Sequence, residues 1–191
     1  MLNPGRHKGA RRMQHWVALL RGVNVGGHNL LPMADLRELC SGLGWTGVQT
    51  YIASGNVLFV AEGAAEDLAA TLQQMIAARM ACEVPVIVLP ATALRAAVAD
   101  CPFEPQAGKH VHGFICWSDP VVDPDALGRL RAASEILIVT GRWVWLYAPD
   151  GIGPSKLAAK LDKVITGTQM TGRNLNTLRK LVEMLDDGRP G

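Results

Sequence analysis

Short apolar runs alternate along this chain with segments of helical periodicity. In the first half, strands are expected at residues 16–20, 48–52, 56–60 and 84–89. These runs are brief and are bounded by glycine, proline or small polar residues, which is typical of buried strands. Residues 33–43 and 65–80 carry leucine and methionine at helical spacing, which predicts two amphipathic helices. The predicted order is β-α-β-β-α-β, the order of a ferredoxin-like unit.

The second half repeats this order more loosely. Strands are expected at residues 110–117, 136–140 and 142–147, and helices at 91–99, 126–132, 154–165 and from about 174 onwards. A helix ends the chain where a fourth strand would complete the order. We therefore predict an α+β fold of two related ferredoxin-like halves, residues 14–89 and 90–191, with a C-terminal helix. Antiparallel or mixed sheets would carry helices on one face, and residues 1–13 would form a flexible basic tail.

Composition narrows the function classes. Hydrophobic residues make up 49% of the 191 residues, which is enough for a core and excludes global disorder. No run approaches the roughly 18 apolar residues that a membrane helix needs, so no membrane partner is predicted. A net charge of +2 does not by itself indicate a nucleic-acid partner. The cysteines are far apart and lack C-x-x-C spacing, which favours free buried thiols and a cytoplasmic location. They are Cys40, Cys82, Cys101 and Cys116.

The segment VALLRGVNVGGHNLLPM, residues 17–33, is the strongest candidate for a site. A strand ends there in a glycine loop that opens onto a helix, an arrangement that brings backbone N–H groups close to a ligand. Gly22 and Gly27 have the glycine spacing of a P-loop, but His28 and Asn29 replace its lysine and its hydroxyl residue. A P-loop NTPase is therefore rejected, and a Rossmann G-x-G-x-x-G is absent. An anion-binding loop and a conformationally demanding turn remain as alternatives.

Two further features of the first half are candidate contributors to the site. Arg21 ends a buried strand and needs a partner, either a carboxylate such as Asp35 or Glu38 or an anionic ligand. The turn Ser54-Gly55-Asn56 joins two predicted strands. Its hydroxyl and amide groups are candidate ligand contacts, and the alternative is a plain hairpin tip.

Two predicted helix starts in the second half carry a cation. Ser155 and Lys156 fall in the first turn of one helix, and Arg173 precedes Asn174, a natural N-cap, at another. A cation there opposes the helix dipole by roughly 0.3–1 kcal/mol, and an anion held by the free N–H groups would remove the conflict. A solvated lysine is the alternative for Lys156. The repetition favours a shared anion.

Other patterns carry less weight. His110 and His112 lie two apart on a strand and face the same way, but no nearby carboxylate or cysteine completes a metal site, so none is predicted. Trp143, Trp145 and Tyr147 share one strand face, which favours core or interface packing over a base-stacking platform. The sequence identifies no cofactor and no catalytic acid–base pair.

Four segments in order resemble a known bacterial family, domain of unknown function 1697. They are ALLRGVNVGGHNLLPM, YIASGNVLF, GIGPSKL and TGRNLNTLRKL, and the resemblance runs from about Gln14 to Leu185. It implies a cytoplasmic bacterial protein of two related α+β halves and supplies no reaction. Pro154 and Gly172 depart from the residues expected in many relatives.

The working hypothesis is a site for a phosphate- or carboxylate-bearing, nucleotide-like small molecule, formed between the halves by the glycine loop and the basic helix starts. The predicted ligand-binding residues are Arg21, Gly22, Asn24, Gly26, Gly27, Ser54, Asn56, Ser155, Lys156, Arg173 and Asn174. The three cations would supply charge, and the others directional hydrogen bonds. A nucleic-acid-binding module is the second hypothesis, opposed by 5% aromatic residues. A structural or oligomerisation protein without a ligand is the third.

Overall fold

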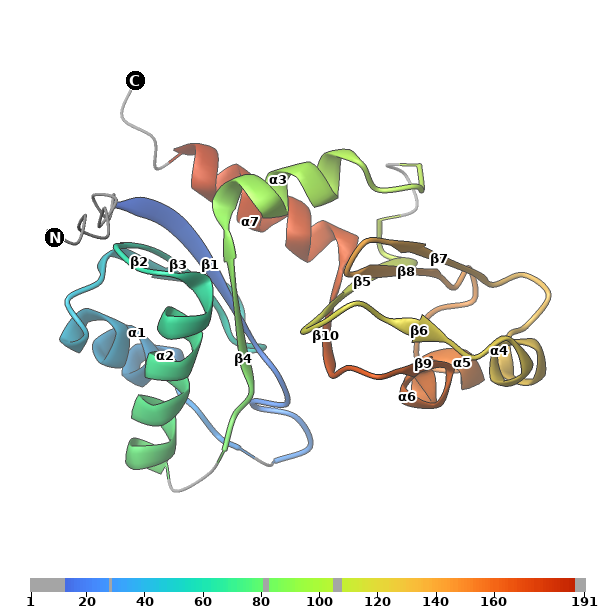
Figure 1. Cartoon of the computed structure of the whole chain (residues 1–191), viewed down its shortest axis with the longest axis horizontal. Helices are drawn as coiled ribbons and strands as arrows, with labels where there is room; N and C mark the ends of the chain where they lie inside the picture. Colours follow the sequence, from blue (N-terminus) through green and yellow to red (C-terminus); the bar gives the residue numbers. More distant parts are fainter. Residues whose placement is uncertain (1–12, 28, 81–82, 105–107, 188–191) are drawn as a thin grey trace, which may run out of the picture. The chain divides into compact units, whose positions relative to one another are not determined.

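The computed structural model describes residues 13–27, 29–80, 83–104 and 108–187 (Figure 1). These residues form two compact units. The first holds the chain up to Ala18 together with Gly22–Pro90, and the second holds Leu19–Arg21 together with the chain from Ala91. The expected basic tail lies outside the described residues, apart from Met13.

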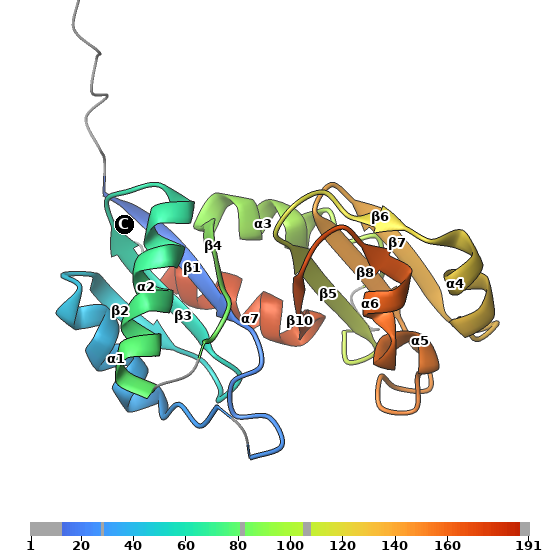
Figure 2. The same cartoon turned by 60° about the horizontal axis from the view of Figure 1, so that its bottom comes forward.

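The first unit has the predicted β-α-β-β-α-β order. Its elements are β1 (Gln14–Leu20), α1 (Met33–Gly42), β2 (Thr46–Thr50), β3 (Asn56–Ala61), α2 (Ala65–Met80) and β4 (Val86–Pro90). The strands form one sheet in the order β2-β3-β1-β4, and β2 pairs antiparallel with β3. Helices α1 and α2 lie together on one face of this sheet (Figures 1 and 2).

Periodic burial explains why these segments fold as they do. The buried residues of α2 are Leu68, Leu72 and Ile76, which recur every fourth position and so form one stripe facing the sheet. Trp45 stacks on Phe59 of β3 with ring centroids 3.9 Å apart. These contacts fix the sheet that carries the glycine loop at the end of β1.

The second unit is built on a second four-stranded sheet. Its elements are α3 (Ala91–Ala99), β5 (Val111–Cys116), β6 (Val121–Val122), α4 (Pro124–Leu130), β7 (Ile136–Thr140), β8 (Trp143–Tyr147), α5 (Lys156–Ala159), α6 (Leu161–Val164), β9 (Ile165–Thr166), β10 (Met170–Asn174) and α7 (Leu175–Asp187). The sheet order is β10-β5-β8-β7 with every neighbouring pair antiparallel, and β6 pairs with β9 in a separate two-stranded sheet.

Three expectations for this half were wrong. The chain does not pass straight into its last helix, because β10 provides the missing fourth strand and pairs with β5. The single helix expected at 154–165 is two short helices, α5 and α6, which are interrupted at Lys160. Helices cover both faces of the sheet instead of one. The alternation of side chains along β8 shows this directly.

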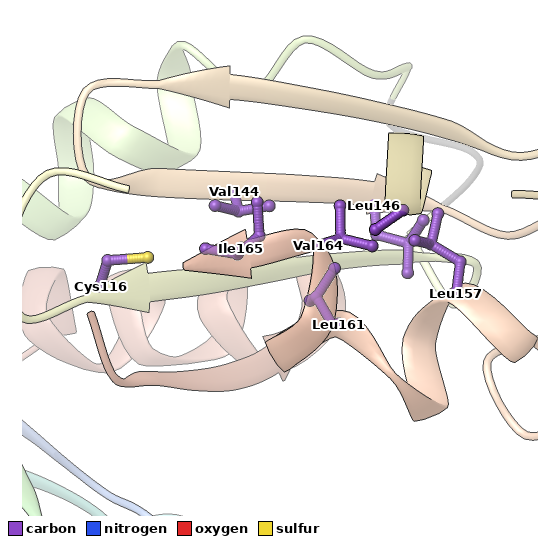
Figure 3. Packing of buried hydrophobic residues seen from close by; sticks show 8 residues of the cluster. Cys116, Val144, Leu146, Leu157, Leu161, Val164 and Ile165 are labelled. Atoms are coloured by element: carbon purple, nitrogen blue, oxygen red, sulfur yellow. The ribbon is translucent and has the colours of Figure 1, made fainter. Parts of the chain in front are cut away.

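Leu146 of β8 packs with Leu157 of α5 and Leu161 of α6 on one face (Figure 3). The neighbouring Trp145 points to the opposite face, because successive strand residues alternate. There it lies over Gly113, beside Leu178 of α7. The sheet is therefore enclosed by α5 and α6 on one side and by α7 on the other.

Two sequence predictions concern the whole described chain. Cys40 and Cys116 are buried free thiols, as expected, and Cys101 is half-buried and free, whereas Cys82 lies outside the described residues. Among the helices of the described ranges, none has the length and apolar character needed to cross a bilayer.

Candidate functional site

The glycine loop after β1 is a tightly turned segment of the first unit. Its backbone has positive φ at five described positions, namely Gly22, Asn24, Gly26, Gly27 and Asn29. Three of the five are glycines, which reach this region without a steric penalty, and asparagine tolerates it better than most residues. The N–H of Asn24 donates to the carbonyl of Asn29 at 3.1 Å. The Nδ2 of Asn29 donates to the carbonyl of Gly22 at 3.0 Å, which closes the loop.

Asn24 ties this loop to the hairpin turn between β2 and β3. Its Nδ2 donates to the carbonyls of Leu31 at 2.9 Å and Ala53 at 2.7 Å. Its Oδ1 accepts from the N–H of Leu31 at 2.8 Å. An asparagine amide has two N–H donors, and both are used here. The side chain of Asn24 therefore holds the two loops together and has no free donor for a ligand.

The turn itself is held by Asn56, which is fully buried. The Nδ2 of Asn56 donates to the carbonyl of Tyr51 at 2.8 Å and to the Oγ of Ser54 at 3.1 Å. Ile52 in the same turn has φ +49°, a genuine outlier for a β-branched residue. The predicted glycine-loop and hairpin residues thus come together, through hydrogen bonds that shape the backbone.

Arg21 lies exposed after β1, in the second unit. Its Nη1 donates to the Oε1 of Gln169 at 3.3 Å. Neither expected carboxylate pairs with it, since the ion pair of Glu38 is with Arg79 at 3.8 Å and Asp35 forms none among the described residues.

Arg173 is buried in strand β10, with 7% of its surface exposed, and lies two residues before the first residue of α7. Its Nη2 donates to the carbonyl of Leu20 at 2.7 Å, and its Nη1 donates to the carbonyl of Gly172 at 2.7 Å and to the Oγ1 of Thr171 at 3.1 Å. Burial lowers the pKa of the Arg173 guanidinium to about 10. Its described contacts are therefore structural.

The helix that follows begins as the sequence indicates. The Oδ1 of Asn174 accepts from the N–H of Thr177 at 2.8 Å, which is the geometry of an N-cap and confirms that expectation. Because this oxygen is used within the helix, its described role is also structural.

A pocket of about 370 Å³ lies within the second unit. Its walls come from the end of α4, the loop that follows, the loop after β8 and the start of α5, and α4 and α5 lie side by side in both views (Figures 1 and 2). The lining residues are Arg129, Leu130, Arg131, Ala132, Glu135, Ala148, Asp150, Gly151, Pro154, Ser155 and Lys156.

The pocket includes two of the eleven predicted site residues. Ser155 is buried and is the N-cap of α5, its Oγ accepting from the N–H of Ala158 at 2.9 Å. Lys156 follows it and is exposed. The other nine predicted residues do not line this pocket.

Sequence reasoning missed the other ionisable groups of the pocket, which are Arg129, Arg131, Glu135 and Asp150. Asp150 stands inside the PDGIGPSKL segment that was singled out. The remaining three lie in GRLRAASE, residues 128–135, where no motif spacing marks them. A fold is needed to bring that segment to the start of α5.

The Nδ1 atoms of His110 and His112 are buried without a hydrogen-bond partner. Burial, reinforced by the charge of His110, lowers the pKa of His112 to about 4. Within the described residues, no group of three or more metal-ligating side chains is found. Trp143 and Trp145 are buried and stack with centroids 5.4 Å apart, which confirms the packing interpretation.

Fold and sequence together define the class: an α+β protein with two four-stranded sheets. The chain belongs to the family described as Protein of unknown function (DUF1697), which it matches over residues 13–145, so the expected family is confirmed. The matched residues include the first two of the four motif segments. Among solved structures, it is similar to the conserved bacterial protein SP0830 from Streptococcus pneumoniae. The two are 23% identical with a TM-score of 0.68, and the likeness covers 91% of this chain and 99% of that one. It extends to the fold alone. Curated proteins gave no match.

Proposed function

We propose that the second unit binds a small anionic molecule, bearing a phosphate or a carboxylate, in the pocket between α4 and α5. One observation carries the proposal. Arg129, Arg131 and Lys156 all line this pocket, and none of them is within 4.0 Å of a carboxylate in the described part of the chain. Cations that line one concave site and are not engaged in an ion pair favour an anion, which accepts charge-assisted hydrogen bonds from them.

The size and the walls of the pocket support the same class of ligand. Ligand sites occupy about 300–1,000 Å³, and this pocket lies near the lower limit, which suits a sugar phosphate or part of a nucleotide. Leu130, Ala148 and Pro154 supply apolar surface beside the charged groups. The capping bond of Ser155 fixes the backbone from which Lys156 projects. The proposal concerns binding and assigns no reaction.

This site differs in composition from the one expected from the sequence. Lys156 and Ser155 are retained, and two arginines from one segment of the second unit take the place of Arg21 and Arg173. We further infer a ferredoxin-like plan for both units, supported by the matching sheet orders β2-β3-β1-β4 and β10-β5-β8-β7. The wide spacing of the cysteines supports the proposal of a cytoplasmic location.

Thermal unfolding against a panel of anions tests the binding proposal. The panel is inorganic phosphate, ribose 5-phosphate, AMP, coenzyme A, citrate and short single-stranded DNA. A ligand at about 100 times its Kd stabilises the fold by about 2.7 kcal/mol, a shift of a few degrees for a chain of this size. Lys156→Ala and Arg131→Ala should abolish the shift.

Lys163→Ala is the matched control, because Lys163 is an exposed lysine on α6 that does not line the pocket. A shift that survives in Lys156→Ala and Arg131→Ala would place the anion elsewhere. A shift produced by DNA alone, with steep salt dependence, would favour the nucleic-acid hypothesis. No shift with any compound would favour a structural protein.

A further inference from the structure

We infer that Glu135 selects the ligand of this pocket, so that the preferred anion also carries hydroxyl groups, as a sugar phosphate does. The inference rests on the proposed function and names the ligand class of the same site. Glu135 lines the pocket although only 5% of its surface is exposed. Glutamate is rarely buried to that extent unless it is paired, so its environment needs an explanation.

The two carboxylate oxygens of Glu135 have different surroundings. Oε2 accepts a hydrogen bond from the N–H of Ala132 at 2.8 Å. Oε1 has no hydrogen-bond partner among the described residues. In that part of the chain, the fully buried side-chain polar atoms without a partner are the Nδ1 atoms of His110 and His112, so Oε1 is not fully buried. Oε1 therefore keeps access to open space, and the open space that Glu135 borders is the pocket.

No described cation satisfies this oxygen. Arg131 lies on the same wall, but its Nη1 points to the backbone carbonyl of Glu135 at 3.5 Å, and no ion pair joins the two side chains within 4.0 Å. An ionised carboxylate oxygen only accepts hydrogen bonds, so Oε1, which borders open space, can bind a donor that enters the pocket. A ligand seated in the pocket can supply that donor.

The charged side chains of the pocket indicate which ligand could supply this donor to Glu135. Lys156 and the two arginines require an anionic group, whereas Glu135 repels a second one and accepts hydrogen bonds from O–H groups. Acidic side chains bind sugar hydroxyls in this way in dinucleotide sites. Asp150 is a second acceptor on the lining, and its Oδ2 accepts from the Oγ of Ser134 at 3.4 Å. A phosphate ester of a polyol matches both requirements, and a simple anion matches only one.

The sharpest test compares two phosphate esters that differ only in hydroxyl groups. Ribose 5-phosphate carries them, and tetrahydrofurfuryl phosphate keeps the ring ether and the phosphate without them. Titration calorimetry on the full chain should show ribose 5-phosphate bound at least about 10-fold more tightly, since hydrogen bonds to charged groups contribute about 1.5–3 kcal/mol each. Glu135→Gln should bring the two Kd values within about 3-fold, by weakening ribose 5-phosphate alone.

Weaker binding of ribose 5-phosphate with unchanged binding of the other ester distinguishes ligand selection by Glu135 from a structural role. Glu135→Gln retains a side-chain oxygen that can accept from Ala132, and Asp162→Asn on α6 removes the same charge away from the pocket as the matched control. If Glu135→Gln weakens both esters equally, Glu135 is structural and the inference is overturned. Equal affinity of the unaltered protein for the two esters overturns it as well, while a loss of both in Lys156→Ala would still uphold the proposed site. Failure of every anion to bind would overturn the proposed function itself.

Discussion

The Nη2 of Arg173 donates a 2.7 Å hydrogen bond to the carbonyl oxygen of Leu20, although the two residues are 153 positions apart. The hydroxyl of Thr171 donates to the same oxygen at 3.2 Å. Both donors come from β10 and reach the last residue of β1. The described acceptors of the buried Arg173 guanidinium are backbone carbonyls and a hydroxyl, so its role is to link two chain segments.

Replacement of Arg173 should therefore destabilise the fold. Arg173→Ala removes the charge-assisted bonds to the carbonyls of Leu20 and Gly172 and to Thr171 from a buried site, so we expect a loss of about 2–4 kcal/mol in the free energy of unfolding. Arg173→Lys should restore little of it, because an ammonium lacks the planar fork that serves several acceptors at once. Urea denaturation measures both.

Arg142→Ala is the control for this experiment, since Arg142 is an exposed arginine with one described side-chain hydrogen bond, to the carbonyl of Trp117. Its change in stability should stay within about 1 kcal/mol. If Arg173→Ala lowered the free energy of unfolding no more than the control does, the structural role of Arg173 would be wrong. A ligand whose binding disappeared in a stable Arg173 variant would return Arg173 to the binding residues.

Asn24 offers a test of the two-loop connection in the first unit. Asn24→Ala removes three side-chain hydrogen bonds and places alanine at φ +55°, so the free energy of unfolding should fall by about 2–3 kcal/mol. Asn24→Gly removes the same bonds without backbone strain and should lose about 1 kcal/mol less. Equal stability of all three proteins, measured by thermal and urea unfolding, would show that these bonds contribute nothing net.

Local periodicity explains which elements the sequence predicts well. Helix α2 begins and ends at the predicted residues, because Leu68, Leu72 and Ile76 form an uninterrupted apolar stripe. Strand β10 has no such signal. It reads Met-Thr-Gly-Arg-Asn, and its buried arginine donates to an acceptor far away in the sequence, the carbonyl of Leu20. Its pairing with β5 is likewise a property of the fold.

The candidate site divides in the same way. Ser155 and Lys156 could be predicted from the sequence, because Gly153 and Pro154 indicate that a helix starts there. Arg131 and Glu135 could not, because a basic and an acidic residue four apart usually form a solvated surface pair. Only the folded chain places them in one pocket with Lys156 and buries Glu135. The glycine loop is easy to find in the sequence but ambiguous, since a strained turn and an anion site share the same glycine pattern.

Stability should depend on pH through His112. Its pKa is lowered to about 4 in the folded protein, whereas in the unfolded chain it takes its ordinary value of 6.5. Between these values the unfolded state binds more protons, so stability is fully present above pH 6.5 and falls as the pH drops towards 4. The physical cause is the buried ring, whose protonation would place a charge next to His110.

Melting temperatures at pH 7.5, 6.5, 5.5 and 5.0 measure this dependence. The unaltered protein should lose stability progressively below pH 6.5, and His112→Leu should show a shallower decline over the same interval. Carboxylates contribute little above pH 5, which keeps the comparison clean. Parallel curves for the two proteins would mean that His112 titrates normally in the folded state.

Gly172 of β10 should be intolerant of any side chain because of Phe114 on the neighbouring strand β5. A Cβ at position 172 would lie 2.4 Å from the Cε1 of Phe114, a separation that real Cβ atoms do not adopt. The two residues are direct partners in the antiparallel register, so the ring covers the bare backbone of Gly172. Gly172→Ala should reduce the free energy of unfolding by about 1–3 kcal/mol through overpacking.

A double-mutant cycle identifies the cause of that loss. Phe114→Leu removes Cε1 and Cζ of the ring, and the smaller leucine side chain can rotate away from position 172. It should cost about 1–2 kcal/mol alone, because Phe114 packs against the apolar cluster around Leu146. In its presence, Gly172→Ala should become nearly neutral, which gives a favourable coupling of about 1–3 kcal/mol between the two substitutions. Strictly additive losses would show instead that position 172 needs glycine for its backbone freedom. In that case Phe114 would approach closely because residue 172 is a glycine, and the ring would not be the reason why a glycine is needed there.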